Sequence, residues 1–215
     1  MYYEPGKGHG LPHNPFKAII APRPIGWIST VDVDGRANLA PYSFFNAVSS
    51  DPDMIAFTSE GLKDSARNAR DTGEFVFNLV TMPLLEKMNI SSSSLPSDVS
   101  EFDFADIEMA QSKIVGAPRV AQTPAAFECK VVMFTEFTQL SGVPTDRYLI
   151  VGQIVGVHIL DEYLVDGHFD MVKAQTLARC GYREYTVVEK VFDVLRPDEM
   201  RSVVFGSDPE RHGQT

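Results

Sequence analysis

The segment IGWISTVDVDG, Ile25–Gly35, decides the fold of the first part of the chain. Its first nine residues are rich in β-branched and aromatic side chains, which favour an extended strand. The Asp-Gly pair that follows is typical of a tight hairpin turn, because these residues tolerate positive φ angles. We therefore predict a strand over 25–33, a turn at Asp34 and Gly35, and a second strand that begins near Ala37.

Short apolar runs further along the chain predict two more strands with a helix between them. MIAFTS (Met54–Ser59) and EFVFNLV (Glu74–Val80) have the length of strands. The intervening segment KDSARNARDTG has Asp64 in position to cap a helix and Gly73 in position to end it. We predict a helix that starts at this Asp64 cap, with Lys63 just outside it.

The second half of the chain adds long β-rich runs. AAFECKVVMFTEFTQL (125–140) and RYLIVGQIVGVHIL (147–160) are joined by turn residues and predict consecutive antiparallel strands, and 184–195 predicts a last strand. A short helix is predicted over Pro83–Asn89, and the polar segment 91–106 is predicted to be a surface excursion. Because helices are inserted among more numerous strands, we predict a mainly β fold, an antiparallel barrel of Greek-key type, rather than a doubly wound sheet.

Length and charge limit the organisation and the partners of the chain. We expect a single domain over residues 1–198 and a tail at 199–215 that is a loose arm or a dimer strap. The formal net charge of −10 over 215 residues argues against a surface for nucleic acid or anionic lipid, which needs a cationic field. The chain shows no secretory signal and no membrane-length apolar run, and Cys129 and Cys180 have no paired spacing, so we expect a cytoplasmic protein.

Three cations, Lys63, Arg67 and Arg70, gather along the predicted helix of this acidic chain. The start of a helix exposes backbone N–H groups that, together with Lys63 and the hydroxyls of Ser65 and Ser59, would suit a phosphate. The alternative is an ordinary solvated basic face, which the spacing alone favours. No Walker-type or GxGxxG loop offers another phosphate cradle.

A second polar segment, APYSFFNAVSSDP (Ala40–Pro52), follows the predicted hairpin. Ser43, Asn46 and Ser49 alternate there with bulky apolar groups. They would offer hydroxyl, amide and backbone donors to a flat heteroaromatic ligand. The alternative, which the pattern alone favours, is a polar loop that caps the barrel.

Six segments that follow one another along the chain resemble one known family. They are NPFKAIIAPRPIGWISTVDVDGRANLAPYSFFNAVSSDP, KDSARNARDTGEFVFNLV, MNISS, VGQIVGVHI, LARCGYREYTVVE and FDVLRP. Together they span about Asn14 to Pro197, nearly the whole chain. The sequence resembles the flavin reductase-like family with the FMN-binding split-barrel fold, in the group that includes flavoredoxin and the reductase component of nitrilotriacetate monooxygenase.

The resemblance implies a homodimer of six-stranded split barrels, with FMN in a groove at or near the subunit interface. The phosphate-side motif of the family is matched by Lys63, Ser65 and Asn68, with Ser59 close by. The segments that line the ribityl chain and the isoalloxazine are matched by Arg23, Pro24, Thr30, Ser43, Asn46 and Ala47. A later motif near the flavin, of the same or the other subunit, is matched by Arg179.

The reaction implied by the resemblance is hydride transfer from NADH or NADPH to FMN, or to FAD, with reduced flavin available to a monooxygenase partner. Because the flavin carries the redox chemistry, we predict no catalytic side chain and no metal site. Two alternatives remain open. One is an electron carrier in the manner of flavoredoxin, which holds FMN tightly without nicotinamide activity, and the other is a non-catalytic flavin-binding protein.

Five further features have both a structural and a functional interpretation. His158 lies within a strand and is interpreted as structural rather than as an acid or base. Cys180 is interpreted as a small buried thiol, and Trp27 as part of the core or of a dimer interface. Some flavin reductases carry a histidine where this chain has Arg147, which could instead meet a nicotinamide phosphate. Met88–Asn89 either closes the groove or simply ends a helix.

Overall fold

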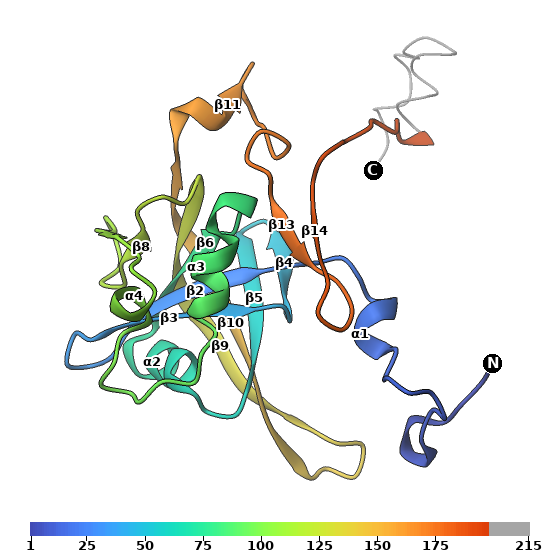
Figure 1. Cartoon of the computed structure of the whole chain (residues 1–215). Coiled ribbons are helices and arrows are strands. Elements are labelled where there is room, and N and C mark those ends of the chain that lie inside the picture. The colour runs from blue at the N-terminus through green and yellow to red at the C-terminus, as the bar shows by residue number, and fades with distance from the viewer. Residues whose placement is uncertain (198–215) are drawn as a thin grey trace, which may run out of the picture.

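A seven-stranded antiparallel sheet forms the centre of the computed structural model, which describes residues 1–197 (Figure 1). The strands follow one another across the sheet in the order β3-β2-β6-β9-β10-β5-β4. They are β2 (Gly26–Val31), β3 (Ala37–Tyr42), β4 (Phe45–Ser50), β5 (Asp53–Glu60), β6 (Glu74–Leu79), β9 (Ala125–Thr138) and β10 (Pro144–Ile159). The predicted tail at 199–215 lies outside the described residues.

The hairpin between β2 and β3 forms where the Asp-Gly pair predicts it. The Asp32 carboxylate accepts hydrogen bonds from the backbone N–H groups of Asp34 (2.9 Å) and Arg36 (2.8 Å), and Gly35 has φ of 83°. Strand β2 is buried on both faces, because it lies between two separate apolar clusters. Trp27 belongs to one cluster and Ile28 to the other, as the alternation of side chains along a strand requires. This explains why the sequence of β2 is a nearly continuous run of apolar and β-branched residues.

The sheet curls so that its two edge strands, β3 and β4, approach each other around a shared core. Tyr42 of β3 packs against Phe57 of β5, with ring centroids 4.9 Å apart, and Phe45 of β4 stacks on Phe77 of β6 at the same distance. No β3–β4 pairing is recorded within residues 1–197, so the barrel stays open along this seam. The predicted antiparallel split barrel is therefore confirmed.

Helices cover the outside of the barrel and connect its strands (Figure 1). The predicted helix after β5 is α2 (Asp64–Thr72), and it ends at Gly73, which has φ of 73° and serves as the left-handed C-cap. The predicted short helix at Pro83–Asn89 is a 3₁₀ turn, η2 (Met82–Leu84), that continues into α3 (Leu85–Ile90). The remaining helical pieces are η1 (Pro5–Lys7), α1 (Phe16–Ile19), α4 (Glu101–Phe104) and η3 (Asp161–Tyr163).

Three small sheets complete the described structure. The one that matters for function has the order β1-β13-β14 and joins the N-terminal and C-terminal segments of the described chain. Its strands are β1 (Arg23–Pro24), β13 (Leu177–Arg179) and β14 (Tyr185–Val187). The other two are hairpins, formed by β7 (Met109–Ala110) with β8 (Arg119–Val120) and by β11 (Leu164–Val165) with β12 (His168–Phe169).

Three sequence predictions are wrong in detail. The segment 91–106 is not only a surface excursion, because its helix α4 places Phe102 in the core at 1% exposure. The polar loop considered for Ala40–Pro52 is instead the end of β3 and the edge strand β4, because pairing with β5 holds the segment extended although most of its side chains are exposed. The last predicted strand, 184–195, is shortened to the three residues of β14.

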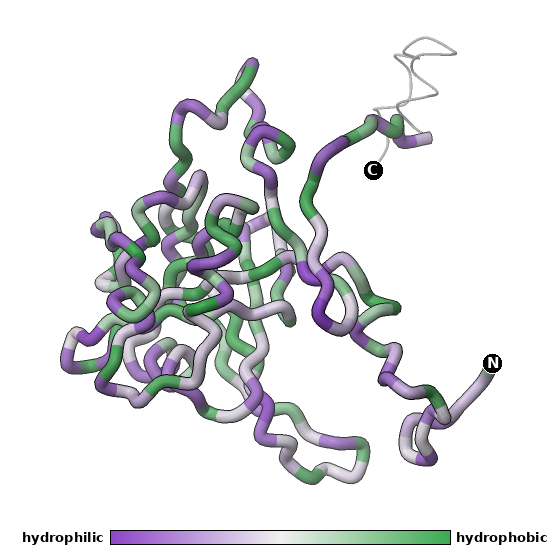
Figure 2. The backbone as a smooth tube through the Cα atoms, viewed as in Figure 1, coloured by the Kyte–Doolittle hydropathy of each residue, from purple (hydrophilic) through white to green (hydrophobic). Residues whose placement is uncertain are grey.

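The hairpin formed by the outer halves of β9 and β10 extends away from the barrel (Figures 1 and 2) and is one of several places where apolar residues are exposed. Val132 and Met133 are each 51% exposed there, and Leu140 at the tip is fully exposed. None of the helices within residues 1–197 is both long enough and apolar enough to span a bilayer.

Candidate functional site

A groove with two adjacent compartments runs between α2, the end of β3, the end of α3 and the small β1-β13-β14 sheet. The helix compartment, at the start of α2, has a volume of about 320 Å³ and is bordered by Lys63 and Ser65. The arginine compartment, beside the small sheet, has a volume of about 390 Å³ and is bordered by Arg23 and Arg179. Pro41 and Ser92 line both compartments, so the two are adjacent. Together they have the size typical of sites for small organic ligands, about 300 to 1,000 Å³.

The start of α2 carries backbone donors that no side chain caps. Lys63, not Asp64, is the N-cap residue, and it makes no side-chain capping hydrogen bond. The first helical hydrogen bond runs from the Arg67 N–H to the Lys63 carbonyl at 2.8 Å, so the amides of residues 64–66 have no partner within the helix. Asp64 instead forms an ion pair with Arg67 and accepts a hydrogen bond from Ser97 at 3.3 Å. The predicted Asp64 cap is therefore wrong, and the helix start is left open to an external anion.

Ser65 is held in the wall of the helix compartment by buried polar neighbours. Its hydroxyl oxygen accepts a hydrogen bond from Asn38 Nδ2 at 2.8 Å, and the residue is 1% exposed. Burial raises the pKa of Tyr42, which the hydroxyls of Ser65 and Ser59 offset only in part, so Tyr42 stays neutral at physiological pH. Asn38 and Tyr42 thus hold the Ser65 hydroxyl in the wall of the helix compartment.

Three of the residues matched to the family's flavin site line neither compartment, although Asn68 of α2 lines a neighbouring cleft. Ser59 is fully buried and donates a hydrogen bond to the Gly61 carbonyl at 2.8 Å. Asn68 and Thr30 are also buried, and the Asn68 amide donates to the Thr30 hydroxyl at 3.2 Å. These bonds pin α2 to β2 and to the turn before the helix, so in this structure the three residues position the helix start rather than line the compartment.

The arginine compartment is built on a pair of arginines that face each other across two strands. Arg23 of β1 lies directly opposite Arg179 of β13. The buried Arg23 guanidinium donates to the carbonyls of Ile20 (3.0 Å) and Cys180 (2.9 Å) and to that of Lys17. The Arg179 guanidinium is only half-buried and lies over a tyrosine ring of β14. Ser43, at the end of β3, lines the same compartment.

The other predicted ring-side residues are placed outside the two compartments. Pro24 follows Arg23 and is exposed. Asn46 and Ala47 are exposed on the edge strand β4, where the Asn46 side-chain oxygen accepts the Ala47 N–H at 2.9 Å. The single chain therefore gathers Arg23, Ser43, Lys63, Ser65 and Arg179 along the groove and leaves the β4 pair on an open edge.

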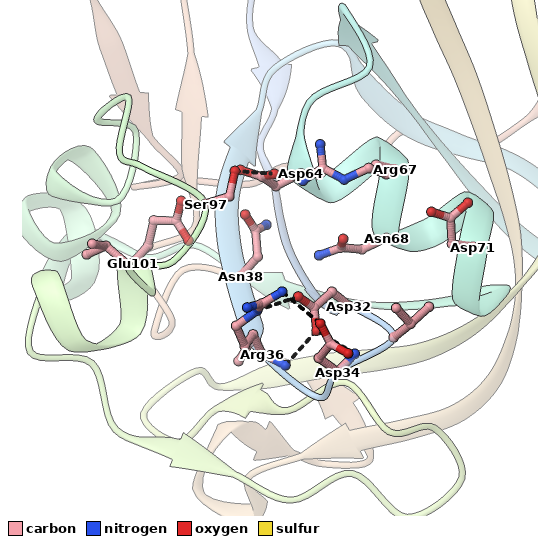
Figure 3. A pocket seen from close by; sticks show the side chains of 13 residues that line it. Asp32, Asp34, Arg36, Asn38, Asp64, Arg67, Asn68, Asp71, Ser97 and Glu101 are labelled. Carbon is pink, nitrogen blue, oxygen red and sulfur yellow. Dashed lines mark hydrogen bonds and ion pairs between the residues drawn. The ribbon is translucent and has the colours of Figure 1, made fainter.

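The basic cluster on α2 divides into one groove residue and two paired ones. Lys63 is exposed at the mouth of the helix compartment. Arg67 is bound to Asp64 and Arg70 to Asp71 at 2.7 Å, and Arg67 faces a neighbouring cleft of about 230 Å³ (Figure 3). That cleft is acidic, because its lining includes Asp32, Asp34, Asp64, Asp71 and Glu101. Positive charge is thus available to a groove ligand from Lys63 alone on this helix.

Several groove residues were missed by the sequence reasoning. Asn38 and Tyr42 are spaced by four along β3, and nothing in their pattern distinguishes them from other strand residues. The serine tract Ser91–Ser94 borders the helix compartment, although its composition indicates only a surface loop. Ser91 is fixed there by the buried Trp27, whose indole N–H donates to its hydroxyl at 2.9 Å. The expectation that Trp27 belongs to the core is confirmed.

His158 lies away from the groove and is structural, as its position in a strand predicts. Its Nε2 lies 2.5 Å from the carboxylate of Glu128, whose side chain is fully buried. That carboxylate also accepts backbone hydrogen bonds from residues Lys113, Ile114 and Val115 at 2.7, 2.6 and 2.9 Å. Burial raises the pKa of Glu128, but the hydrogen bonds from His158 and the three amides outweigh it and lower the pKa to about 2.

The fold places this chain in the split-barrel class of proteins. The Flavin reductase like domain model matches residues 20–172, and the chain belongs to that family. An uncharacterised protein of Aquifex aeolicus is 34% identical over 174 residues, which cover 78% of this chain and 85% of that protein.

Solved structures share the fold. Nitrilotriacetate monooxygenase component B from Bacillus cereus superposes with a TM-score of 0.82 at 23% identity, covering 90% of this chain and 98% of that one. Flavoredoxin of Desulfovibrio vulgaris (Miyazaki F) gives a TM-score of 0.72 at 20% identity, covering 80% of this chain and 90% of that one.

Proposed function

We propose that the groove binds FMN, with the phosphate at the start of α2 and the ring system where the two compartments meet. The uncapped amides of residues 64–66, next to Lys63 and Ser65, carry this proposal. A row of free N–H donors at the positive end of a helix dipole, with an ammonium beside it, is the donor set that a phosphate monoester requires. Membership in the flavin reductase like family supports flavin as the ligand class.

The residues present fit such a ligand in charge as well as in size. The protein carries a net charge of −10, yet Lys17, Arg23 and Arg179 line one end of the groove without a carboxylate among the described residues. At the other end Lys63 stands with Asp64, which is paired with Arg67, and with Glu101, whose pKa burial raises. Ser43 would border the ring system. The same basic side chains would favour negative charge that develops on the ligand during reduction, because charge stabilisation by preorganised donors is strong in a partly desolvated site.

The activity we propose is transfer of hydride from NADH or NADPH to the flavin, by a homodimer that supplies reduced flavin to a monooxygenase component. Bound flavin supplies the hydride-accepting ring. The chain's own contribution is to hold the phosphate at α2, to orient the ring beside Ser43, and to keep a positive field around it. The solved relatives named for nitrilotriacetate monooxygenase and flavoredoxin support the two halves of this proposal, a reductase component and a carrier of electrons.

The phosphate assignment is tested by comparing FMN with riboflavin, which lacks the phosphate. Lys63→Ala combined with Ser65→Ala should weaken FMN binding by roughly 10- to 100-fold, since a charge-assisted hydrogen bond is worth about 1.5–3 kcal/mol. Riboflavin binding should change little. Fluorescence titration of the apoprotein measures both affinities. An equal loss for both ligands would mean that the substitutions damage the groove rather than a phosphate contact.

The redox assignment is tested by anaerobic addition of NADH and NADPH to the FMN-loaded protein. We expect the flavin absorbance near its long-wavelength maximum to bleach with at least one of the two nucleotides. FMN that is bound but is reduced by neither nucleotide would overturn the reductase proposal. It would leave the electron-carrier alternative, in which electrons come from another protein.

A further inference from the structure

We propose that the arginine compartment binds an oxyanion, a carboxylate or phosphate group, on a planar aromatic second substrate. Its role as the second-substrate site rests on the proposed flavin chemistry, whereas anion binding itself does not. The key residues are Arg23, Arg179, Lys17, Tyr182 and Tyr185, all of which line this compartment.

The first observation is an uncompensated concentration of positive charge. Arg23 and Arg179 stand opposite each other in the register of β1 and β13, an arrangement that destabilises a strand pair when the charges are alike. No carboxylate lines the compartment among the described residues, and within residues 1–197 neither arginine forms an ion pair. Lys17 adds a third cation and lies 5.3 Å from the centre of the Phe44 ring without an acidic partner in the described chain. The compartment keeps a repulsive arrangement that a bound anion would relieve.

The second observation is an unmet donor in the buried guanidinium. Arg23 is 8% exposed, and its Nη atoms donate to the backbone carbonyls of α1 and of the β13–β14 turn. Its Nε atom is buried and has no hydrogen-bond partner. A buried donor left unpaired costs free energy, so its presence at the wall of a cavity is informative. A small shift of the Arg23 side chain toward a bound oxyanion would satisfy it.

The third observation is the way in which Arg179 is held. Its Nη2 donates to the Tyr182 carbonyl at 2.7 Å, and its guanidinium carbon lies 4.4 Å from the centre of the Tyr185 ring. Tyr182 has φ of 54°, a conformation that bulky residues rarely adopt, and this conformation directs its carbonyl to Arg179. The hairpin thus fixes the guanidinium and leaves its remaining N–H groups for a ligand.

The shape of these groups indicates the chemical class of the ligand. A guanidinium fork matches the two oxygens of a carboxylate or phosphate and binds them bidentately. The side chains of Tyr182 and Tyr185 provide aromatic surface next to the fork, which favours a planar ring on the same ligand. The acidic cleft that borders the helix compartment, with five carboxylate side chains in its lining, offers no such place (Figure 3). An acidic protein that keeps this one compartment free of carboxylates is built to admit an anion there.

The test compares three single-ring probes by isothermal titration calorimetry on the whole protein without added flavin. Benzoate and phenyl phosphate carry the oxyanion, and benzamide is the neutral isostere of benzoate. We expect at least one anion to bind 10-fold or more tightly than benzamide, and the anion whose binding depends on Arg179 identifies carboxylate or phosphate as the natural group of the arginine compartment. Arg179→Gln and Lys17→Gln should each remove most of that preference, while thermal unfolding confirms that the variants are folded.

Two control variants locate the effect within the molecule. Arg147→Gln removes an exposed arginine that, like Arg179, is bound to backbone carbonyls, and it should leave the preference for anions unchanged. Lys63→Gln changes the helix compartment, where we propose the FMN phosphate, so this control uses benzoate: the preference for benzoate over benzamide should be unchanged. Equal binding of benzoate, phenyl phosphate and benzamide would overturn the proposal, as would an anion preference that depends on Lys63 but not on Arg179. A protein that binds these anions but not FMN would instead refute the flavin proposal alone.

Discussion

The start of α2 and the loop at 113–115 present the same chemical feature, consecutive backbone N–H groups free of helix or strand partners, but only in the loop does the chain itself supply an anion. In the loop, the chain supplies it: the fully buried Glu128 carboxylate accepts three amides and lies beside His158. At the helix start no side chain fills the place, and Lys63 stands beside it. The difference separates a site that stabilises the fold from a site that is open to a ligand.

Position in the barrel explains why the two sites differ. Glu128 lies on β9, a central strand whose inward position excludes water, so its charge must be satisfied within the protein. The α2 start lies at the mouth of a groove, where water or a ligand can serve the free amides. A site at the surface can therefore stay incomplete without a large cost in stability.

The largest expected effect comes from removing the internal anion. Glu128→Ala leaves three amides and the His158 ring without their acceptor, and we expect the free energy of unfolding to fall by roughly 3–5 kcal/mol. Denaturant unfolding measures this change. Glu128→Gln is the matched control, because it keeps the shape and one acceptor oxygen and should lose less. A loss below 1 kcal/mol for Glu128→Ala would mean that water replaces the carboxylate in this loop.

The next effect comes from giving the helix start its own anion. Lys63→Asp puts an acceptor at the N-cap position, which should raise the free energy of unfolding by about 1 kcal/mol. The same change places negative charge where we propose the FMN phosphate, so FMN affinity should fall by roughly 100-fold while riboflavin affinity stays nearly constant. Unfolding curves and flavin titrations on one preparation test both. Higher stability with unchanged FMN affinity would separate the helix start from the flavin site.

Acid should lower the free energy of unfolding through the Glu128 site, as Glu128→Ala does, but by a smaller amount. Hydrogen bonds lower the pKa of Glu128 in the folded protein to about 2, from about 4.5 in the unfolded chain. The carboxylate therefore makes its full contribution to the free energy of unfolding above pH 4.5. It is lost as the pH falls from there through about 2, because the unfolded chain binds the proton first. The stability difference between the wild type and Glu128→Gln should therefore shrink in that window. A difference that stays constant from pH 5 to pH 2.5 would contradict the lowered pKa.

The two sites also differ in how far the sequence predicts them. Local patterns predict the β2–β3 hairpin, helix α2 and its end at Gly73, because turn and cap residues act over a few positions. The pairing of Glu128 with His158 was not predicted, since it depends on two strands of the barrel and on a register shift between Ile154 and Gly156. The helix cap predicted at Asp64 is wrong, because this side chain forms an ion pair with Arg67 and accepts a hydrogen bond from Ser97 instead of capping the helix.

Tertiary packing accounts for the remaining differences at the groove. The resemblance matches Ser59, Thr30 and Asn68 to the flavin site, and in the structure their side chains are buried and hydrogen-bonded around α2, a detail that sequence position does not carry. The arginine compartment joins β1 to β13, more than 150 residues apart along the chain, as the 157-residue separation between Arg23 and Cys180 shows. The cations of the arginine compartment, Lys17, Arg23 and Arg179, come together only when the chain folds.

The smallest expected effect tests which cations of the α2 cluster belong to the open site. Arg70 is 42% exposed at its side chain and paired with Asp71 on the solvent side of the helix, and exposed pairs of this kind contribute about 0–1 kcal/mol. Arg70→Ala should therefore change the free energy of unfolding by less than about 1 kcal/mol and leave the FMN affinity within about twofold of the wild type. Lys63→Ala, measured beside it, removes the same charge from the groove mouth and should reduce FMN affinity about 10-fold or more. Equal losses for the two variants would show that the ligand responds to the summed charge of the helix, and the distinction drawn between a local anion site and a solvated basic face would fail.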